Sequence, residues 1–125
     1  MKARIKIGNK ILDISLIDTS TSKKIWEKLP YKSIAKRWGE EVYFSLPIVT
    51  KIDKCAKTIV ELGQIAYWVE GESVVVGFGP TPISKSNEIR LITKVNIWAT
   101  SLGDPKIFKE TKNGDEVYIS RLNNP

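Results

Sequence analysis

Aromatic side chains are the residues of this sequence best suited to contact a ligand, because rings supply large contact areas in binding sites. The candidates to line a binding groove are Tyr43, Trp68, Phe78 and Trp98. Neighbours in a strand face opposite sides, so one ring in each of the pairs Tyr43–Phe44 and Tyr67–Trp68 must point away from the core. Core packing is the alternative role for every such ring, and we favour it for Phe44 and Phe78.

The stretch VVVGFGPTPIS, residues 74–84, raises the question of a phosphate-binding glycine loop. Such a loop needs glycines that lead into a helix, and here prolines follow them without a Lys-Ser/Thr pair. The stretch instead predicts a core strand in which Gly77 and Gly79 permit close backbone approach or a bulge. A stiff turn follows, and its Pro80, Thr81 and Pro82 are further ligand-binding candidates.

Histidine is absent from the chain, which removes the usual general base and the commonest transition-metal ligand. We therefore expect no metal site and no cofactor. Arg37 is the candidate catalytic residue, since its guanidinium could hold a peptide carbonyl. A salt bridge from Arg37 to Glu40 or Glu41 is the alternative. The single cysteine, Cys55, cannot form an internal disulfide, which agrees with a cytoplasmic protein.

Size and charge indicate one globular domain over residues 1–125, with no apolar run long enough to span a membrane. Residues 1–60 carry 13 Lys and Arg against 6 Asp and Glu, whereas residues 61–125 carry 7 against 8. A basic half can bind an anionic partner, although a solvated surface is the more common role. The abundance of Ile, Lys and Glu also suits a thermophilic source.

Hydrophobic periodicity predicts the elements that position these residues. Residues 2–7 and 11–17 alternate apolar and polar side chains around a Gly8-Asn9-Lys10 turn, which is typical of a β-hairpin. Residues 18–29 change to a helical period, with N-cap oxygens at the start and Pro30 as the stop. Ile25, Trp26 and Leu29 share one face of that helix.

The rest of the chain favours strands, with turns at Gly39-Glu40 and at residues 70–72. In the segment 94–101, Val95, Ile97 and Ala99 are expected on one face and Trp98 on the other. About eight strands and one helix predict a mainly β fold, a closed eight-stranded antiparallel barrel with the amphipathic helix plugging an end. A closed barrel leaves no open sheet edge.

Four blocks in this order also carry a family resemblance: RWGEEVYFSLP (37–47), LGQIAYWVEG (62–71), VVVGFGPTPIS and VNIWATS (95–101). With them the chain resembles the cyclophilin-like family of small archaeal and bacterial proteins, whose members mostly lack an assigned function. The resemblance implies a cyclophilin-type eight-stranded barrel with a helix at one end. The F-x-R and Q-G-G-D motifs of true prolyl isomerases do not occur in this sequence.

Three functions remain open at this point. The favoured hypothesis is a barrel that binds a peptide or a small molecule near the aromatic and proline candidates. A weak peptidyl-prolyl isomerase is the first alternative, because that reaction needs neither a nucleophile nor a metal. An RNA-binding barrel is the second. Nucleic acid is less favoured because Lys and Arg fall on both faces of several elements. Monomer and homodimer are both compatible with the sequence.

Overall fold

The computed structural model describes residues 1–122 and consists of nine β-strands, one α-helix and one 3-10 helix. In chain order the elements are β1 (Lys2–Ile7), β2 (Lys10–Leu16), α1 (Ser20–Lys28), β3 (Tyr31–Arg37), β4 (Glu41–Ser45), β5 (Lys57–Val60), β6 (Gln64–Trp68), β7 (Ser73–Gly77), β8 (Ile89–Ser101), η1 (Pro105–Phe108) and β9 (Glu116–Leu122).

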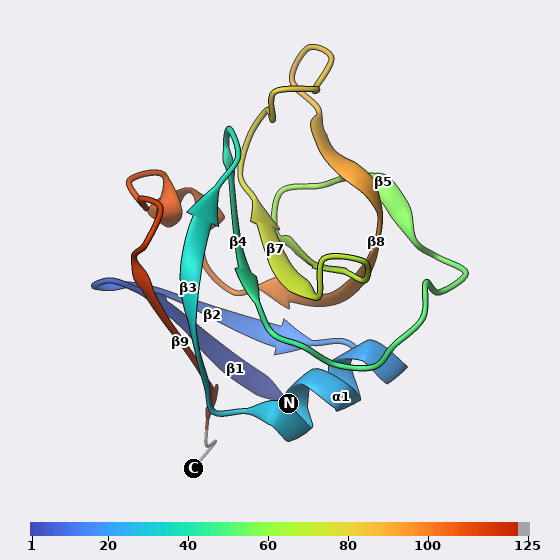
Figure 1. The fold of residues 1–125 in the computed structure, drawn as a ribbon, viewed down its shortest axis with the longest axis vertical. Coiled ribbons are helices and arrows are strands. Elements are labelled where there is room, and N and C mark those ends of the chain that lie inside the picture. Colours follow the sequence, from blue (N-terminus) through green and yellow to red (C-terminus); the bar gives the residue numbers. More distant parts are fainter. Residues whose placement is uncertain (123–125) are drawn as a thin grey trace.

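Eight of the strands form a closed barrel. The hydrogen-bonded order is β2-β1-β9-β3-β4-β7-β6-β8, and β2 pairs with β8 to complete the ring. Every pair is antiparallel, and the curved strands enclose the centre of the molecule in Figure 1. The predicted eight-stranded antiparallel barrel is therefore confirmed. The remaining strand, β5, lies outside the ring and pairs only with β8.

The opening hairpin follows from its alternating sequence. Ala3, Ile5 and Ile7 of β1 point into the barrel with Leu12 and Ile14 of β2, and all are buried. The alternate positions carry charged side chains such as those of Lys2 and Lys6 at the surface. Because each strand presents one apolar face, rolling the sheet into a barrel buries that face completely.

Helix α1 lies at the lower end of the barrel in Figure 1. The Thr19 hydroxyl caps it by accepting a hydrogen bond from the backbone N–H of Ser22 at 3.0 Å. Ile25 is fully buried in the barrel core, Leu29 is buried beside it, and Trp26 packs against it from a half-buried position. The predicted helix and its apolar face are confirmed. From η1, Phe108 also reaches into this core and is fully buried.

Strand β8 differs from its predicted length and alternation. It begins at Ile89, ahead of the predicted segment 94–101, and runs for 13 residues. Opposite β6 the register shifts, so that Ile65 faces Ala99 while Ala66 faces Ile97. A bulge of this kind inserts one unpaired residue. Trp98 and Ala99 are consequently both buried in the barrel core, which corrects the expectation that they face opposite sides.

Within residues 1–122, no helix combines the length and the apolar character needed to cross a lipid bilayer.

Candidate functional site

A second apolar cluster covers part of the outer face of the barrel. It contains Val60 of β5, Ala66 of β6, Val75 of β7 and three residues of the first half of β8, namely Ile89, Leu91 and Val95. Strand β7 is therefore buried on both faces, with Val74 and Val76 inside the barrel and Val75 in the outer cluster. In Figure 1 the first half of β8 and β5 arch over this side of the barrel.

Tyr43 and Trp68 lie on this outer face. Their strand neighbours Phe44 and Tyr67 are fully buried inside the barrel, as the predicted alternation requires. The Tyr43 and Trp68 rings meet edge to face, with centroids 6.2 Å apart and an interplanar angle of 76°. This arrangement is a favourable one for aromatic pairs, and it fixes the rings at the edge of the outer cluster.

Two glycines allow close packing around this face. A Cβ at Gly77 would lie 2.6 Å from Ile89 Cγ2, and one at Gly71 would lie 2.2 Å from Trp68 Cε3. Both distances are far below van der Waals contact, so any side chain at either position would push its neighbour away. The predicted close approach at Gly77 is confirmed. The Trp68 indole can occupy its position because Gly71 has no side chain.

These residues surround a small cavity that we call the outer pocket. It has a volume of about 190 Å³ and is lined by Trp38, Glu41, Tyr43, Trp68, Val75, Leu91, Ile92 and Val95. Three aromatic rings and four aliphatic side chains make this lining largely apolar. For comparison, a cavity of roughly 150 Å³ in a protein core can hold a benzene molecule.

Glu41 is the charged residue of the outer pocket, and only 5 % of its surface is exposed. It starts β4 and points outward like Tyr43, because the intervening Val42 is buried in the barrel core. Burial raises the pKa of the Glu41 carboxyl from 4.5 to about 8, and burial is the only cause of that shift. The carboxyl is thus largely protonated at neutral pH and can donate a hydrogen bond.

Trp68, which also lines the pocket, has an unpartnered donor. Its Nε1–H is buried, and among residues 1–122 it is the one buried side-chain nitrogen or oxygen without a hydrogen-bond partner. Buried polar groups without partners are rare in folded proteins, and each costs about 1–3 kcal/mol. The outer pocket itself combines an apolar lining with a carboxyl that is largely shielded from water.

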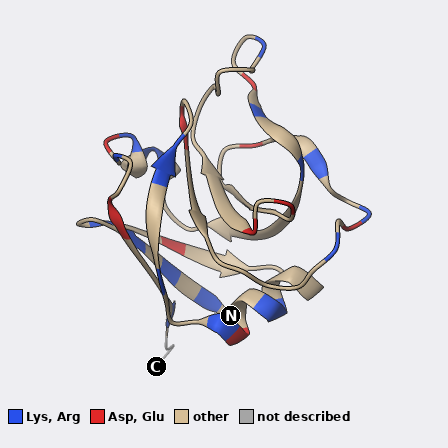
Figure 2. Ribbon diagram, viewed as in Figure 1, with Lys and Arg blue, Asp and Glu red and all other residues tan. Residues whose placement is uncertain are grey.

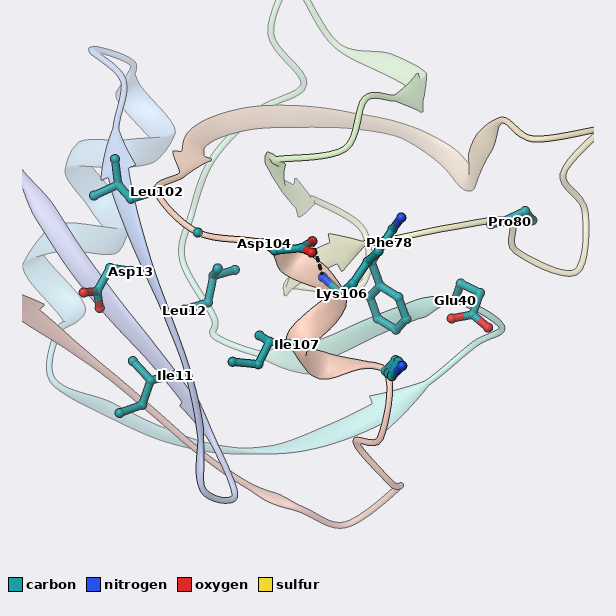
Figure 3. A pocket seen from close by; sticks show the side chains of 12 residues that line it. Ile11, Leu12, Asp13, Glu40, Phe78, Pro80, Leu102, Asp104, Lys106 and Ile107 are labelled. Carbon is teal, nitrogen blue, oxygen red and sulfur yellow. Dashed lines mark hydrogen bonds between the residues drawn. The ribbon is translucent and has the colours of Figure 1, made fainter.

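Phe78 and Pro80 lie at a different place, which we call the end pocket. Figure 3 shows it between η1, β2 and the segment that follows β7. Its volume is about 1040 Å³, and its lining consists of Ile11, Leu12, Asp13, Glu40, Phe78, Pro80, Leu102, Gly103, Asp104, Lys106, Ile107 and Lys109. Phe78 is only 4 % exposed, so the exposed apolar surface here comes mainly from Ile11, Leu102 and Ile107.

Arg37 is held by the backbone. Its Nη1 donates hydrogen bonds to the carbonyls of Lys109 at 2.7 Å and Thr111 at 2.9 Å, and its Nε and Nη2 donate to Gly39 O at 3.1 and 2.9 Å. The guanidinium also lies 5.2 Å from the centroid of Phe78. The nearest carboxylate, that of Glu40, is 3.9 Å away. Arg37 therefore ties the β3–β4 turn to the segment after η1.

The remaining candidates, Thr81, Pro82 and Trp98, line neither of these pockets. The Thr81 hydroxyl donates to the carbonyl of Arg90, and its backbone N–H donates to Ser84 Oγ at 2.9 Å, which fastens the turn to the start of β8. Pro82 is exposed, and its Cδ lies against Gly39. Trp98 is fully buried, and its Nε1 donates to the carbonyl of Ala66 at 3.0 Å.

The sequence-based candidates therefore separate into two sites. Tyr43 and Trp68 meet in the outer pocket, whereas Phe78 and Pro80 belong to the end pocket. Sequence reasoning missed Glu41, Trp38 and the first half of β8 as parts of the site. One available signal was the run Val74–Val76, since consecutive β-branched residues indicate a strand covered on both faces.

Figure 2 shows Lys and Arg on several separate elements, including β1, α1 and the loop that precedes β5. Within residues 1–122, no group of three or more Cys, Asp or Glu side chains is placed to hold a metal ion.

Comparison with known proteins agrees with this geometry. The chain is similar to the hypothetical protein AF2241 from Archaeoglobus fulgidus, whose solution structure matches with a TM-score of 0.84 and 32% identity, over 98% of this chain and 95% of that one. It also matches the structure of McbB in complex with tryptophan, with a TM-score of 0.70 and 13% identity, over 98% of this chain and 45% of that one. No curated protein matches the sequence. The family model described as cyclophilin-like matches residues 1–120, and the protein belongs to that cyclophilin-like family.

Proposed function

We propose that this protein is a small-ligand-binding barrel and that the outer pocket is its binding site. One observation carries the proposal: the Glu41 carboxyl, which is almost wholly buried, lies in a largely apolar pocket beside three aromatic rings. Ligand sites typically combine an apolar lining with a few polar groups that orient the ligand. Titratable groups with strongly shifted pKa values also concentrate at such sites.

The end pocket is a weaker candidate for the binding site than the outer pocket. It is larger and more open, and two of its carboxylates already have partners. Asp13 forms an ion pair with Arg4 at 2.8 Å, and Asp104 accepts a hydrogen bond from the backbone N–H of Lys106 at 3.0 Å. Its polar groups are thus stable without a ligand, unlike those of the outer pocket.

The two alternative functions are less favoured. A prolyl isomerase centred on Arg37 would need a guanidinium free to meet the prolyl carbonyl, and this one already donates to three backbone carbonyls. RNA binding would be favoured by a continuous basic surface, and Figure 2 shows the basic residues dispersed over several elements. For comparison, McbB, which has the same fold, is described in complex with tryptophan, a small aromatic ligand.

The proposal predicts that the outer pocket, and not the end pocket, binds small aromatic probes. Indole and tryptamine present a ring without and with an amine, and ligand-observed NMR would measure their affinities. Gly71→Ala forces Trp68 out of place, so we expect it to weaken binding of the probe at least tenfold. The matched control is Gly103→Ala in the end pocket, where the new Cβ would lie an acceptable 3.5 Å from Leu12 Cδ1.

Thermal unfolding of both variants would show that they remain folded. The proposal is wrong if neither these ring compounds nor a small ammonium compound such as choline binds the parent protein. It is also wrong if Gly71→Ala retains full affinity while Gly103→Ala loses it, because the end pocket would then be the binding site.

A further inference from the structure

The outer pocket has an unusual charge character for this protein. The chain carries 20 Lys and Arg residues and a net charge of +6, yet none of these basic residues lines the pocket. The ionisable side chains of the lining are the Glu41 carboxyl and the Tyr43 phenol, neither of which carries a positive charge. A ligand group that enters the pocket therefore meets carboxyl and ring surfaces and no cation.

The neighbouring charged groups reinforce this character. On β8, Arg90 forms an ion pair with Glu88 and Lys94 is exposed, while on the β3–β4 turn Arg37 is bound to backbone carbonyls. None of these groups contributes to the raised pKa of Glu41, which arises from burial alone. The Glu41 carboxyl thus lacks a positive partner within the described protein.

The aromatic lining is the second feature that selects a ligand. Trp38, Tyr43 and Trp68 line one small cavity with Glu41. Ring faces attract cations through their quadrupoles, and several rings around one site are a known way to bind alkylated ammonium groups. A carboxylate among such rings would add direct charge pairing in a place with little water.

We propose that the outer pocket binds a small organic amine or quaternary ammonium compound. Its nitrogen lies between the Glu41 carboxylate and the aromatic rings. This inference rests on the proposed function, since it names the ligand class of the same site. Binding of the cation is coupled to loss of the Glu41 proton.

Choline and 3,3-dimethylbutan-1-ol provide the test, because they have nearly the same shape and differ in the charged nitrogen. Protein-observed NMR titrations at pH 6 and pH 9 would measure both affinities. We expect choline to bind at least tenfold more tightly than the alcohol at pH 9. We also expect its affinity to fall at least tenfold at pH 6, where Glu41 is protonated, while that of the alcohol stays constant.

One variant makes the test specific. Glu41→Gln should lower the choline affinity at pH 9 at least tenfold and abolish its pH dependence, while the attraction to the rings remains. Equal, pH-independent binding of choline and the alcohol in the pocket would overturn the amine inference and leave the proposed function intact. If tryptamine, indole and choline all fail to bind, both are overturned.

Discussion

Replacing Glu41 with glutamine is expected to stabilise the protein at neutral and alkaline pH. The pKa of the buried carboxyl is about 8, against 4.5 for an ordinary glutamate. Between these values the unfolded chain has released the proton and the folded protein retains it, so the free energy of unfolding falls by about 1.4 kcal/mol per pH unit. Glutamine is neutral throughout, so at pH 7 the variant should be more stable by roughly 3 kcal/mol.

The sign of this effect distinguishes Glu41 from a carboxylate in a salt bridge. Its stabilising contribution is fully present below pH 4.5 and is lost as the pH rises through about 8, whereas a paired carboxylate stabilises at high pH. Urea unfolding at pH 5, 6, 7 and 8 would measure the slope. The matched control is Glu40→Gln at the neighbouring position. The Glu40 side chain is exposed, so this substitution should change the free energy of unfolding by less than about 0.5 kcal/mol.

Equal pH slopes for the parent and Glu41→Gln would show that the carboxyl is not buried as described. A confirmed slope would show that the fold retains a residue that lowers its stability. A loss of stability of this kind is common at functional sites, where a residue is needed for function although it destabilises the fold.

Trp98→Ala is expected to destabilise the barrel by about 3–5 kcal/mol, the usual range for removing a large buried ring. Trp98 is fully buried in the barrel core, and its Nε1 donates to the Ala66 carbonyl. The variant loses the packing of the indole and leaves that carbonyl without its partner. Urea unfolding would measure the change, or circular dichroism would show that the variant fails to fold.

Trp26→Ala provides the comparison for this variant. Trp26 is half-buried on α1, with the Arg121 guanidinium 4.8 Å from its ring centroid, and its removal should cost clearly less, about 1–2 kcal/mol. Trp98→Phe restores most of the apolar volume and should recover part of the stability. A loss below 1 kcal/mol for Trp98→Ala would contradict its role in the core, and would restore it as a candidate for ligand contact.

The barrel was predictable because its sequence signals are local. Alternation in residues 2–7 and 11–17 set which side chains face inward, and the change of period at Asp18 marked the helix. Each of these features depends on a few consecutive residues. The order of the strands around the ring, with β9 between β1 and β3, depends on contacts between distant segments that no local pattern reveals.

The first half of β8 was missed although its sequence carried a signal. Residues 89–95 read IRLITKV, whose apolar and β-branched residues favour a strand, whereas the preceding ISKSNE favours neither a strand nor a helix. The bulge at Trp98 comes from pairing with β6 and not from local sequence. Tertiary packing decides the bulge.

The candidate site was predictable in part for the same reason. Alternation showed that Tyr43 and Trp68 would leave the core if their neighbours entered it, and the structure brings these two rings together. Alternation also placed Glu41 on the side of Tyr43, although it could not show that this surface is covered by β8. Without that cover Glu41 would be an ordinary solvated carboxylate.

The most direct test of the binding site is an NMR spectrum of the tryptophan indole N–H groups during addition of tryptamine. The chain has four tryptophans, and two of them, Trp38 and Trp68, line the outer pocket. Trp98 is sealed in the core, and Trp26 lies on α1, so both serve as internal controls. Substitution of each tryptophan by phenylalanine would assign the four signals. We expect saturable shifts of the Trp38 and Trp68 signals, with the Trp26 and Trp98 signals unchanged. Saturable binding that leaves the Trp38 and Trp68 signals in place, or no binding at all, would show that the outer pocket is not the binding site.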